Sequence, residues 1–152
     1  RSTGKAWGLA GFRIGYLAAD PELTGSLQKV RGMYETSSVA VAIFERMLDH
    51  RDAVEASVAR LLAGKRAFLA AMHDLGLRTH AGHGNFLHVA FGPHAGAVHA
   101  ALADLVLYRR DFEEPCLAGF SRFSATTTER FQPVIDRVRA VVTHHEPTGV
   151  SP

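Results

Sequence analysis

The N-terminal stretch of the chain carries the side chains best suited to chemistry. Lys5 stands in a run rich in glycine, and Arg13 follows it eight residues later. A lysine amine is a nucleophile once it has lost its proton, and nearby positive charge or removal of water lowers its pKa. A planar guanidinium can hold a phosphate through two parallel hydrogen bonds. The residue types alone leave open whether this is a reactive site or a surface loop with a solvated lysine.

Two common phosphate-binding motifs do not fit this stretch. A P-loop requires Ser or Thr directly after Gly-Lys, whereas Ala6 follows Lys5. The dinucleotide fingerprint requires G-x-G-x-x-G, and the spacing of Gly8, Gly11 and Gly15 does not supply it. The sequence therefore argues against both of these nucleotide sites.

The composition argues against several further classes of protein. Lys and Arg number 17 against 15 Asp and Glu, so the net charge is only +2 and no nucleic-acid partner is expected. No apolar run reaches the roughly 18 residues of a membrane span, so no membrane partner is expected. The single cysteine, Cys116, rules out an internal disulfide and fits the cytoplasm, where we expect the protein. Five histidines between His80 and His99 lack a zinc-binding framework, so no metal site is expected.

Hydrophobic periodicity predicts the elements that must position these residues. Apolar residues at helical spacing predict a helix over 36–48 and a longer one over about 51–75, which Gly76 ends. The run Phe12–Leu17 has the character of a short strand. Asp20–Pro21 then forms a turn or begins a short helix.

The second half of the chain predicts a mixture of strands and helices. Strands are expected over residues 85–91, 105–109 and 119–125. An alanine-rich helix is expected over 94–104, and a last helix follows the cap residues 126–128 and runs to about Val142. It could start at Glu129, but Pro133 fits better if the regular helix starts at Pro133 itself. The order strand–helix–strand–strand–helix is typical of an α+β domain.

Residues 2–16 resemble the cofactor-lysine motif of the class I and II aminotransferases of fold type I, which bind pyridoxal 5′-phosphate (PLP). That motif reads Ser/Thr-x-Ser-Lys-x-(aromatic)-Gly-Leu-Ala-Gly-Leu-Arg-(Ile/Val)-Gly-Tyr, and the match is closest to the histidinol-phosphate aminotransferase-like branch. The resemblance implies that Lys5 forms the Schiff base with PLP, while Arg13 and Ser2 bind its phosphate. Gly4 stands where the motif has serine, which removes one hydroxyl donor.

Two later segments are similar to substrate-binding strands of the same family. Residues 84–89 resemble Ala-Asn-Phe-(Leu/Val)-x-Val, which implies that Asn85 lies near the substrate carboxylate. Residues 120–126 resemble Leu-Arg-(Ile/Val)-(Thr/Ser)-(Ile/Val)-Gly-Thr, whose arginine clamps the α-carboxylate, and Arg122 takes that place. A surface arginine and a strand-edge asparagine are the alternatives for these two residues.

The segment 31–38 resembles the linker between the cofactor lysine and the long helix, which lies near the dimer interface in the family. Tyr34 and Thr36 could therefore serve the partner's active site in a homodimer. Ordinary turn and cap residues are an equally good interpretation of both.

The resemblance as a whole implies an α/β fold and a division of the chain. Residues 1–35 end the large cofactor domain, 36–76 form connecting helices, 77–143 form the α+β small domain and 144–152 form a loose tail. Because the chain opens on Arg-Ser-Thr-Gly-Lys without Met, we expect a C-terminal fragment that is inactive alone.

The implied parent enzyme transfers an amino group between an amino acid and a 2-oxo acid. A PLP-dependent decarboxylase or lyase on the same scaffold is the alternative enzyme. A non-catalytic oligomerisation module that kept the fold is the alternative from another class.

Overall fold

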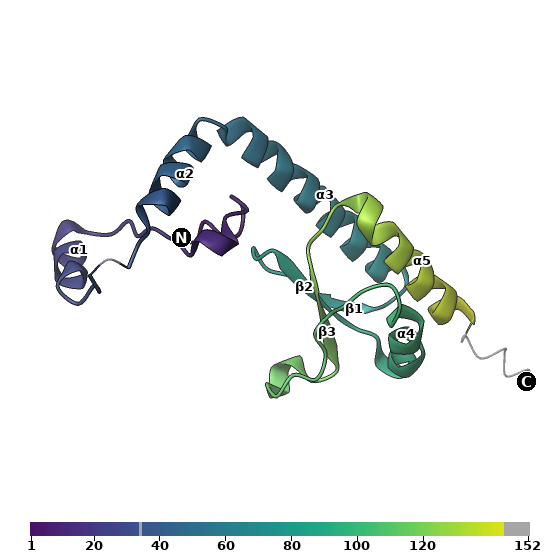
Figure 1. The fold of residues 1–152 in the computed structure, drawn as a ribbon. Helices are drawn as coiled ribbons and strands as arrows, with labels where there is room; N and C mark the ends of the chain where they lie inside the picture. Colours follow the sequence, from purple (N-terminus) through teal and green to yellow (C-terminus); the bar gives the residue numbers. More distant parts are fainter. Residues whose placement is uncertain (34, 145–152) are drawn as a thin grey trace, which may run out of the picture. The chain divides into compact units, whose positions relative to one another are not determined.

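The computed structural model describes residues 1–33 and 35–144 (Figure 1). By its internal contacts the chain forms two compact units, Arg1–Val58 and Ala59–Pro152. The boundary falls inside a helix, α3 (Arg51–Asp74). The domain boundaries placed after residues 35, 76 and 143 stay predictions.

The first unit begins with a loop that folds back on itself. Ser2 and Gly15 form a single antiparallel bridge, and a 3-10 helix, η1 (Ala10–Phe12), lies between them in the chain. Arg13 then adopts a left-handed conformation with φ 54°, which an extended strand does not allow. The strand predicted over Phe12–Leu17 is therefore wrong, because the chain turns at Arg13 and only one residue pairs.

Two helices complete the first unit: α1 (Pro21–Gln28) and α2 (Ser38–Leu48). The Asp20 carboxylate accepts a hydrogen bond of 2.9 Å from the Glu22 amide, and proline occupies the first position of α1. The helix alternative at Asp20–Pro21 is thus confirmed, as is the helix predicted over 36–48.

The long predicted helix is confirmed as α3, and glycine ends it. Gly76 has φ 69°, a conformation that costs glycine little because it lacks a Cβ. The Gly76 amide donates to the His73 carbonyl at 2.9 Å, and the Leu77 amide donates to the Met72 carbonyl at 3.0 Å. These bonds satisfy carbonyls of the last helical turn and redirect the chain into the sheet.

The second unit contains a three-stranded antiparallel sheet in the order β1-β2-β3. Its strands are β1 (Arg78–His80), β2 (Phe86–Ala90) and β3 (Phe120–Ser124). The two longer strands confirm the predictions for 85–91 and 119–125. The sequence did not predict β1, because Arg-Thr-His offers no alternation of apolar and polar residues.

The strand predicted over 105–109 is wrong. The amides of Leu105 and Val106 both donate to the Leu102 carbonyl at 3.1 Å, so the chain there still follows a helical turn. Only Arg109 reaches the sheet, as an isolated bridge to Arg122.

One face of the sheet packs against helices. α4 (Ala95–Leu102), α5 (Thr128–His144) and the C-terminal part of α3 supply its cover (Figure 1). The buried side chains of this core include Phe68, Met72, Leu87, Val89, Phe91, Val98, Leu102, Phe123, Phe131, Ile135 and Val138. Burying one such side chain stabilises the fold by roughly 1.5–3 kcal/mol. The mixed architecture agrees with the predicted α/β class.

The last helix begins earlier than the favoured start at Pro133. α5 starts at Thr128, the Phe131 amide already donates to the Thr127 carbonyl at 3.1 Å, and Pro133 lies inside the helix. Since proline has no N–H, one hydrogen bond of the helix is given up at an exposed position. The buried apolar residues of α5 compensate for this loss, which the local rule used for the prediction could not weigh.

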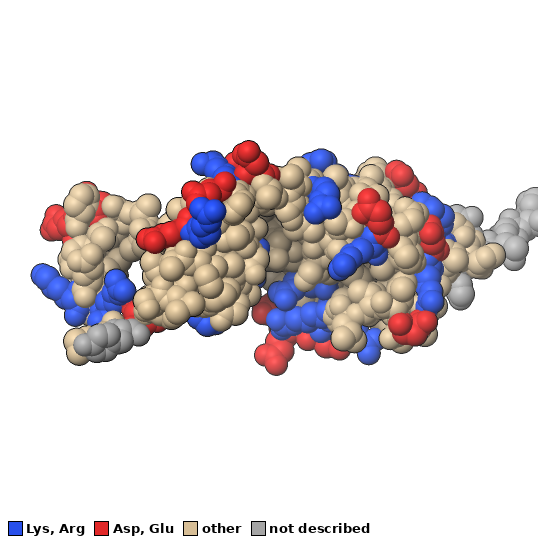
Figure 2. Space-filling model, turned by 45° about the horizontal axis from the view of Figure 1, so that its top comes forward, with Lys and Arg blue, Asp and Glu red and all other residues tan. Residues whose placement is uncertain are grey.

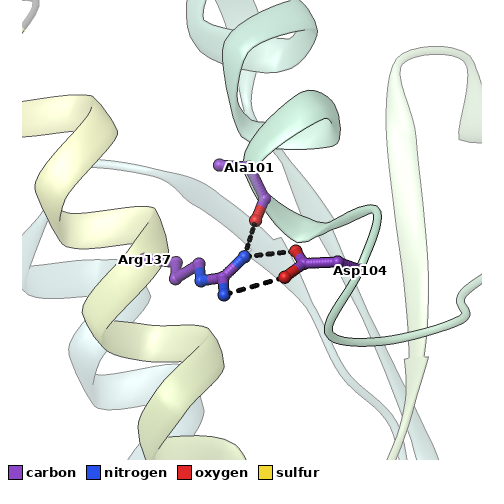
Figure 3. A network of polar contacts seen from close by, with 3 residues as sticks. All are labelled: Ala101, Asp104 and Arg137. Carbon is purple, nitrogen blue, oxygen red and sulfur yellow. Dashed lines mark hydrogen bonds and ion pairs between the residues drawn. The ribbon is translucent and has the colours of Figure 1, made fainter.

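A polar clamp fastens α5 to the end of α4 (Figure 3). The Arg137 guanidinium donates to the Ala101 carbonyl at 2.6 Å and pairs through two nitrogens with the Asp104 carboxylate. The hydrogen bond from Arg137 holds the pKa of Asp104 below its ordinary value. One planar guanidinium thus binds both a backbone carbonyl and a carboxylate near the C-terminal end of α4.

The surface carries charges of both signs. On the face shown in Figure 2, Lys and Arg side chains are interspersed with Asp and Glu. In the described part of the chain, no helix combines the length and the apolar character needed to cross a bilayer.

Candidate functional site

The loop that carries Lys5 is closed by backbone bonds at its ends. The Thr3 hydroxyl is fully buried and donates to the Ile14 carbonyl at 2.6 Å. Outside this contact, the Tyr16 amide donates to the Arg1 carbonyl at 2.9 Å. Thr3 was not singled out in the sequence, because a lone threonine gives no signal of burial. The closure holds Lys5 and Arg13 on one short, defined segment.

Within this loop the three predicted cofactor ligands are exposed. Lys5, Arg13 and Ser2 all face solvent, and none forms an ion pair with a described residue. The Ser2 hydroxyl oxygen accepts a hydrogen bond of 3.2 Å from the Gly4 amide. That bond fixes the hydroxyl while its own proton stays available for an anion. An amine, a guanidinium and a hydroxyl without acidic partners form a donor set for an aldehyde that carries a phosphate.

The backbone of the loop explains two of its glycines. A Cβ on Gly15 would lie 2.8 Å from the Arg1 carbonyl oxygen, and a Cβ on Gly4 would lie 3.0 Å from the Ala10 Cα. The absence of the usual serine before Lys5 therefore has a physical reason, since a side chain at this position would require the backbone at Ala10 to move. Arg13 holds a left-handed conformation without being glycine, a strain of about 1–3 kcal/mol that is common at functional sites.

Aromatic residues support the loop from α2. The Trp7 and Phe44 rings meet edge to face at 5.3 Å, and the Tyr16 ring stacks on Phe44 at 6.2 Å. These contacts join the residues on both sides of η1 to one helix, which limits the freedom of the segment between them.

In the second unit, Arg122 lies on the sheet face opposite the helices. It is half-buried, pairs in register with His88 of β2, and its guanidinium lies 5.3 Å from the Phe86 ring centroid. Arg109 sits across from Arg122 on the other side, with two backbone bonds of 2.7 and 3.2 Å between them. No described acidic residue pairs with Arg122. This face is therefore cationic and aromatic, and it suits an anionic ligand.

Two residues of this face were missed in the sequence. Arg109 was assigned to a strand without a role, and His88 was read only as part of a histidine cluster. The register of β2 and β3 places His88 beside Arg122, and an isolated bridge places Arg109 on its other side. A pair of arginines a dozen residues apart gives no sequence signal that they share a strand bridge.

Asn85 stands at the entry to β2, where the backbone is held from two sides. Its carbonyl accepts a 2.8 Å bond from the Ala125 amide, and its side chain is exposed. The preceding loop is held by Lys65 of α3, whose buried ammonium donates to the Gly82 carbonyl at 2.7 Å and the Gly84 carbonyl at 2.8 Å. The structure thus brings Asn85 and Arg122 to neighbouring strands, although it records no direct contact between them.

Removing the Lys65 ammonium is expected to loosen this loop. Lys65→Met keeps the apolar stem and leaves two loop carbonyls without their charged donor, which costs roughly 1.5–3 kcal/mol in unfolding free energy. Urea denaturation followed by circular dichroism measures this loss. The matched control is Arg66→Met on the exposed side of the same helix, which is expected to change stability by less than about 0.5 kcal/mol. Equal effects of the two substitutions would contradict the role of Lys65.

The residues predicted to act in trans lie in the first unit. Thr36 is half-buried and lines a pocket with Tyr16 and the ion-paired Arg31 and Glu35. Tyr34 lies outside the described residues. The role of either residue in a partner's site stays a prediction.

The described residues form no candidate metal site. Among residues 1–33 and 35–144, no three His, Cys, Asp or Glu side chains come close enough together to hold a metal ion. Cys116 is an exposed free thiol.

Comparison with known proteins adds the family. A family model described as aminotransferase class I and II matches residues 1–138. The chain is 34% identical over 141 residues to histidinol-phosphate aminotransferase of Streptomyces avermitilis, covering 91% of this chain and 37% of that protein. It is 31% identical over 146 residues to the enzyme of that name from Paenarthrobacter aurescens, covering 93% of this chain and 37% of that protein.

A solved structure has the same fold. Histidinol-phosphate aminotransferase from Sinorhizobium meliloti, in complex with pyridoxal-5'-phosphate, superposes with a TM-score of 0.72 at 23% identity, covering 95% of this chain and 40% of that chain. The chain thus spans 37% of the length of the two curated relatives and contains the segments on which the resemblance rests. It belongs to the family of class I and II aminotransferases.

Proposed function

We propose that this chain is the lysine-bearing and small-domain part of a PLP-dependent aminotransferase. The parent enzyme transfers an amino group between an amino acid and a 2-oxo acid, and it acts as a cytoplasmic homodimer. The observation that carries the proposal is the closed loop 1–16, which presents the Lys5 amine and the Arg13 guanidinium to solvent without acidic partners.

The residues of the loop fit the cofactor's functional groups. The Lys5 amine would hold the cofactor at its aldehyde carbon, while Arg13 and the Ser2 hydroxyl would hold its phosphate. When bound, PLP withdraws electrons from the substrate's Cα. The Lys5 amine would move a proton to and from Cα, which requires it to be held near the reacting bond.

The second unit supplies recognition of the substrate. Arg122 binds the α-carboxylate through two hydrogen bonds, and Asn85 lies at the entry of the neighbouring strand. Because amino acid and 2-oxo acid share this carboxylate, one arginine serves both substrates. The bidentate grip also orients Cα–H, which lowers the entropic part of the barrier.

The reaction type is tested with the full-length protein and isotopically labelled donors. Each donor, an amino acid or histidinol phosphate, carries ¹⁵N in its amino group and is incubated with 2-oxoglutarate or pyruvate. The expected result is ¹⁵N in glutamate or alanine without release of carbon dioxide. Carbon dioxide released without amino transfer would instead identify a decarboxylase. Tight PLP binding without either product would identify a non-catalytic module.

A further inference from the structure

We infer that His88 is a second anion-recognition residue beside Arg122, which takes up a proton when a carboxylate binds to this face of the sheet. The inference rests on the proposed function of Arg122 and extends it from a single clamp to a clamp coupled to protons. His88 has no role in the reaction as described above.

The sheet register places the two side chains together. His88 of β2 and Arg122 of β3 are direct cross-strand partners, so their Cβ atoms lie about 4.5–5.5 Å apart on one face. The Phe86 ring contacts both side chains, with its centroid 5.5 Å from that of the imidazole and 5.3 Å from the Arg122 guanidinium. Across the other edge of β2, His80 of β1 pairs with His88, with ring centroids 6.1 Å apart.

His88 carries a polar atom that the protein itself does not satisfy. The side chain is 6% exposed, and its Nδ1 is buried without a hydrogen-bond partner. Three phenylalanine rings surround the imidazole at 5.5 to 6.3 Å: Phe86, Phe112 and Phe120. A buried polar group without a partner costs free energy, whereas an apolar residue of similar volume at the same place would cost none. The imidazole is therefore suited to a partner that arrives with the ligand.

Basic side chains from both neighbouring strands lie near His88. His80 and Arg78 come from β1, and Arg122 comes from β3. Arg109, bridged to Arg122, places its guanidinium 4.5 Å from the centroid of the Phe112 ring that contacts His88. Burial first, and then the charges of His80 and Arg122, lower the pKa of His88, so the free site holds it neutral.

Binding of an anion reverses the balance of these charges. A carboxylate on Arg122 neutralises one cation and offers an acceptor, so the pKa of His88 rises in the complex. A group whose pKa is higher in the complex takes up a proton on binding, and the affinity grows as the pH falls through that pKa. Each unit of difference between the free and bound pKa makes binding about tenfold tighter at the lower pH.

Proton uptake can be measured without turnover. The full-length protein loaded with PLP is titrated with 3-phenylpropionate in calorimetry at pH 7, in two buffers of different ionisation enthalpy. The expected result is uptake of a measurable fraction of a proton per ligand, and tighter binding at pH 6 than at pH 8. The uncharged 3-phenylpropanamide is expected to produce no uptake.

Three variants assign the proton. His88→Gln is expected to bind the carboxylate with no remaining uptake, and His80→Gln, changed on the same face, is expected to keep it. His88→Leu fills the same space without the unpartnered Nδ1, so it should melt no lower than the wild type while it also loses the uptake. Equal proton uptake in the wild type and both His88 variants, or no proton uptake in the wild type, would overturn the inference. Neither result would contradict binding of the carboxylate by Arg122.

A different result is expected if Arg122 does not bind the carboxylate. In that case Arg122→Gln would bind 3-phenylpropionate as tightly as the wild type, which contradicts the role of Arg122 itself. The inference about His88 would then fall with it, whatever the uptake measured.

Discussion

Replacing Lys5 with alanine is expected to abolish turnover in the full-length enzyme. Without its amine, the loop 1–16 retains Arg13 and Ser2 for the phosphate but has no group to attach the aldehyde or to move the proton at Cα. Loss of a positioned acid–base group alone lowers the rate by about 10²–10⁴-fold, and loss of covalent attachment adds to it. Turnover is measured by ¹⁵N transfer, and attachment by mass spectrometry of the protein after borohydride reduction.

The control for this prediction is the neighbouring exposed lysine of the same unit. Lys29 follows α1, and Lys29→Ala is expected to keep both turnover and the reducible attachment. The assignment of Lys5 would be wrong if Lys5→Ala kept near-normal turnover. It would also be wrong if the cofactor were still attached to this variant after borohydride reduction. A peptide map that places the attached cofactor on Lys29 would have the same consequence.

Replacing Arg122 is expected to impair both halves of the reaction. The α-carboxylate is common to the amino acid and the 2-oxo acid, so Arg122→Ala should slow each half-reaction by roughly 10- to 150-fold, corresponding to the loss of about 1.5–3 kcal/mol. The penalty should appear in the rate of the chemical step as well as in binding, because the clamp orients Cα–H. Stopped-flow of each half-reaction with the cofactor's absorbance measures both.

Two comparisons separate recognition from structure. Arg122→Lys should recover little of the loss, because an ammonium cannot reproduce the two-pronged geometry of a guanidinium. Amines without a carboxylate should react equally well with wild type and variant. Arg78→Ala, which removes a cation lying 4.8 Å from the Phe120 ring centroid on the same sheet face, is the matched control and should leave both half-reactions nearly unchanged. If Arg78→Ala were as damaging as Arg122→Ala, the general charge of the face would matter rather than a specific clamp.

Local rules predicted the elements that depend on local sequence. The apolar stripe of α3 and the glycine that ends it were both found in advance, because helical spacing and a left-handed C-cap are properties of neighbouring residues. The family and the roles expected for Lys5, Arg13 and Arg122 also followed from short motifs. The family is confirmed by comparison, while the roles of these residues stay predictions.

Elements whose stability depends on distant partners were not predictable in this way. β1 contains only polar and charged residues and exists because β2 offers it a hydrogen-bonding edge. The start of α5 at Thr128, with Pro133 inside, depends on the burial of its apolar face in the core of the second unit. Gly64 belongs to the same class, because a Cβ there would lie 2.1 Å from the Thr126 carbonyl oxygen, a contact between segments far apart in the chain.

The same division holds for the candidate site. By itself the sequence determined which residue types are present, and the spacing of Lys5 and Arg13 on one segment. Only the tertiary structure decided that Thr3 closes this segment, that Lys65 holds the loop before Asn85, and that His88 flanks Arg122. The physical reason is that hydrogen bonds and strand register join residues far apart in the chain, such as His88 and Arg122, and no local pattern records such pairs.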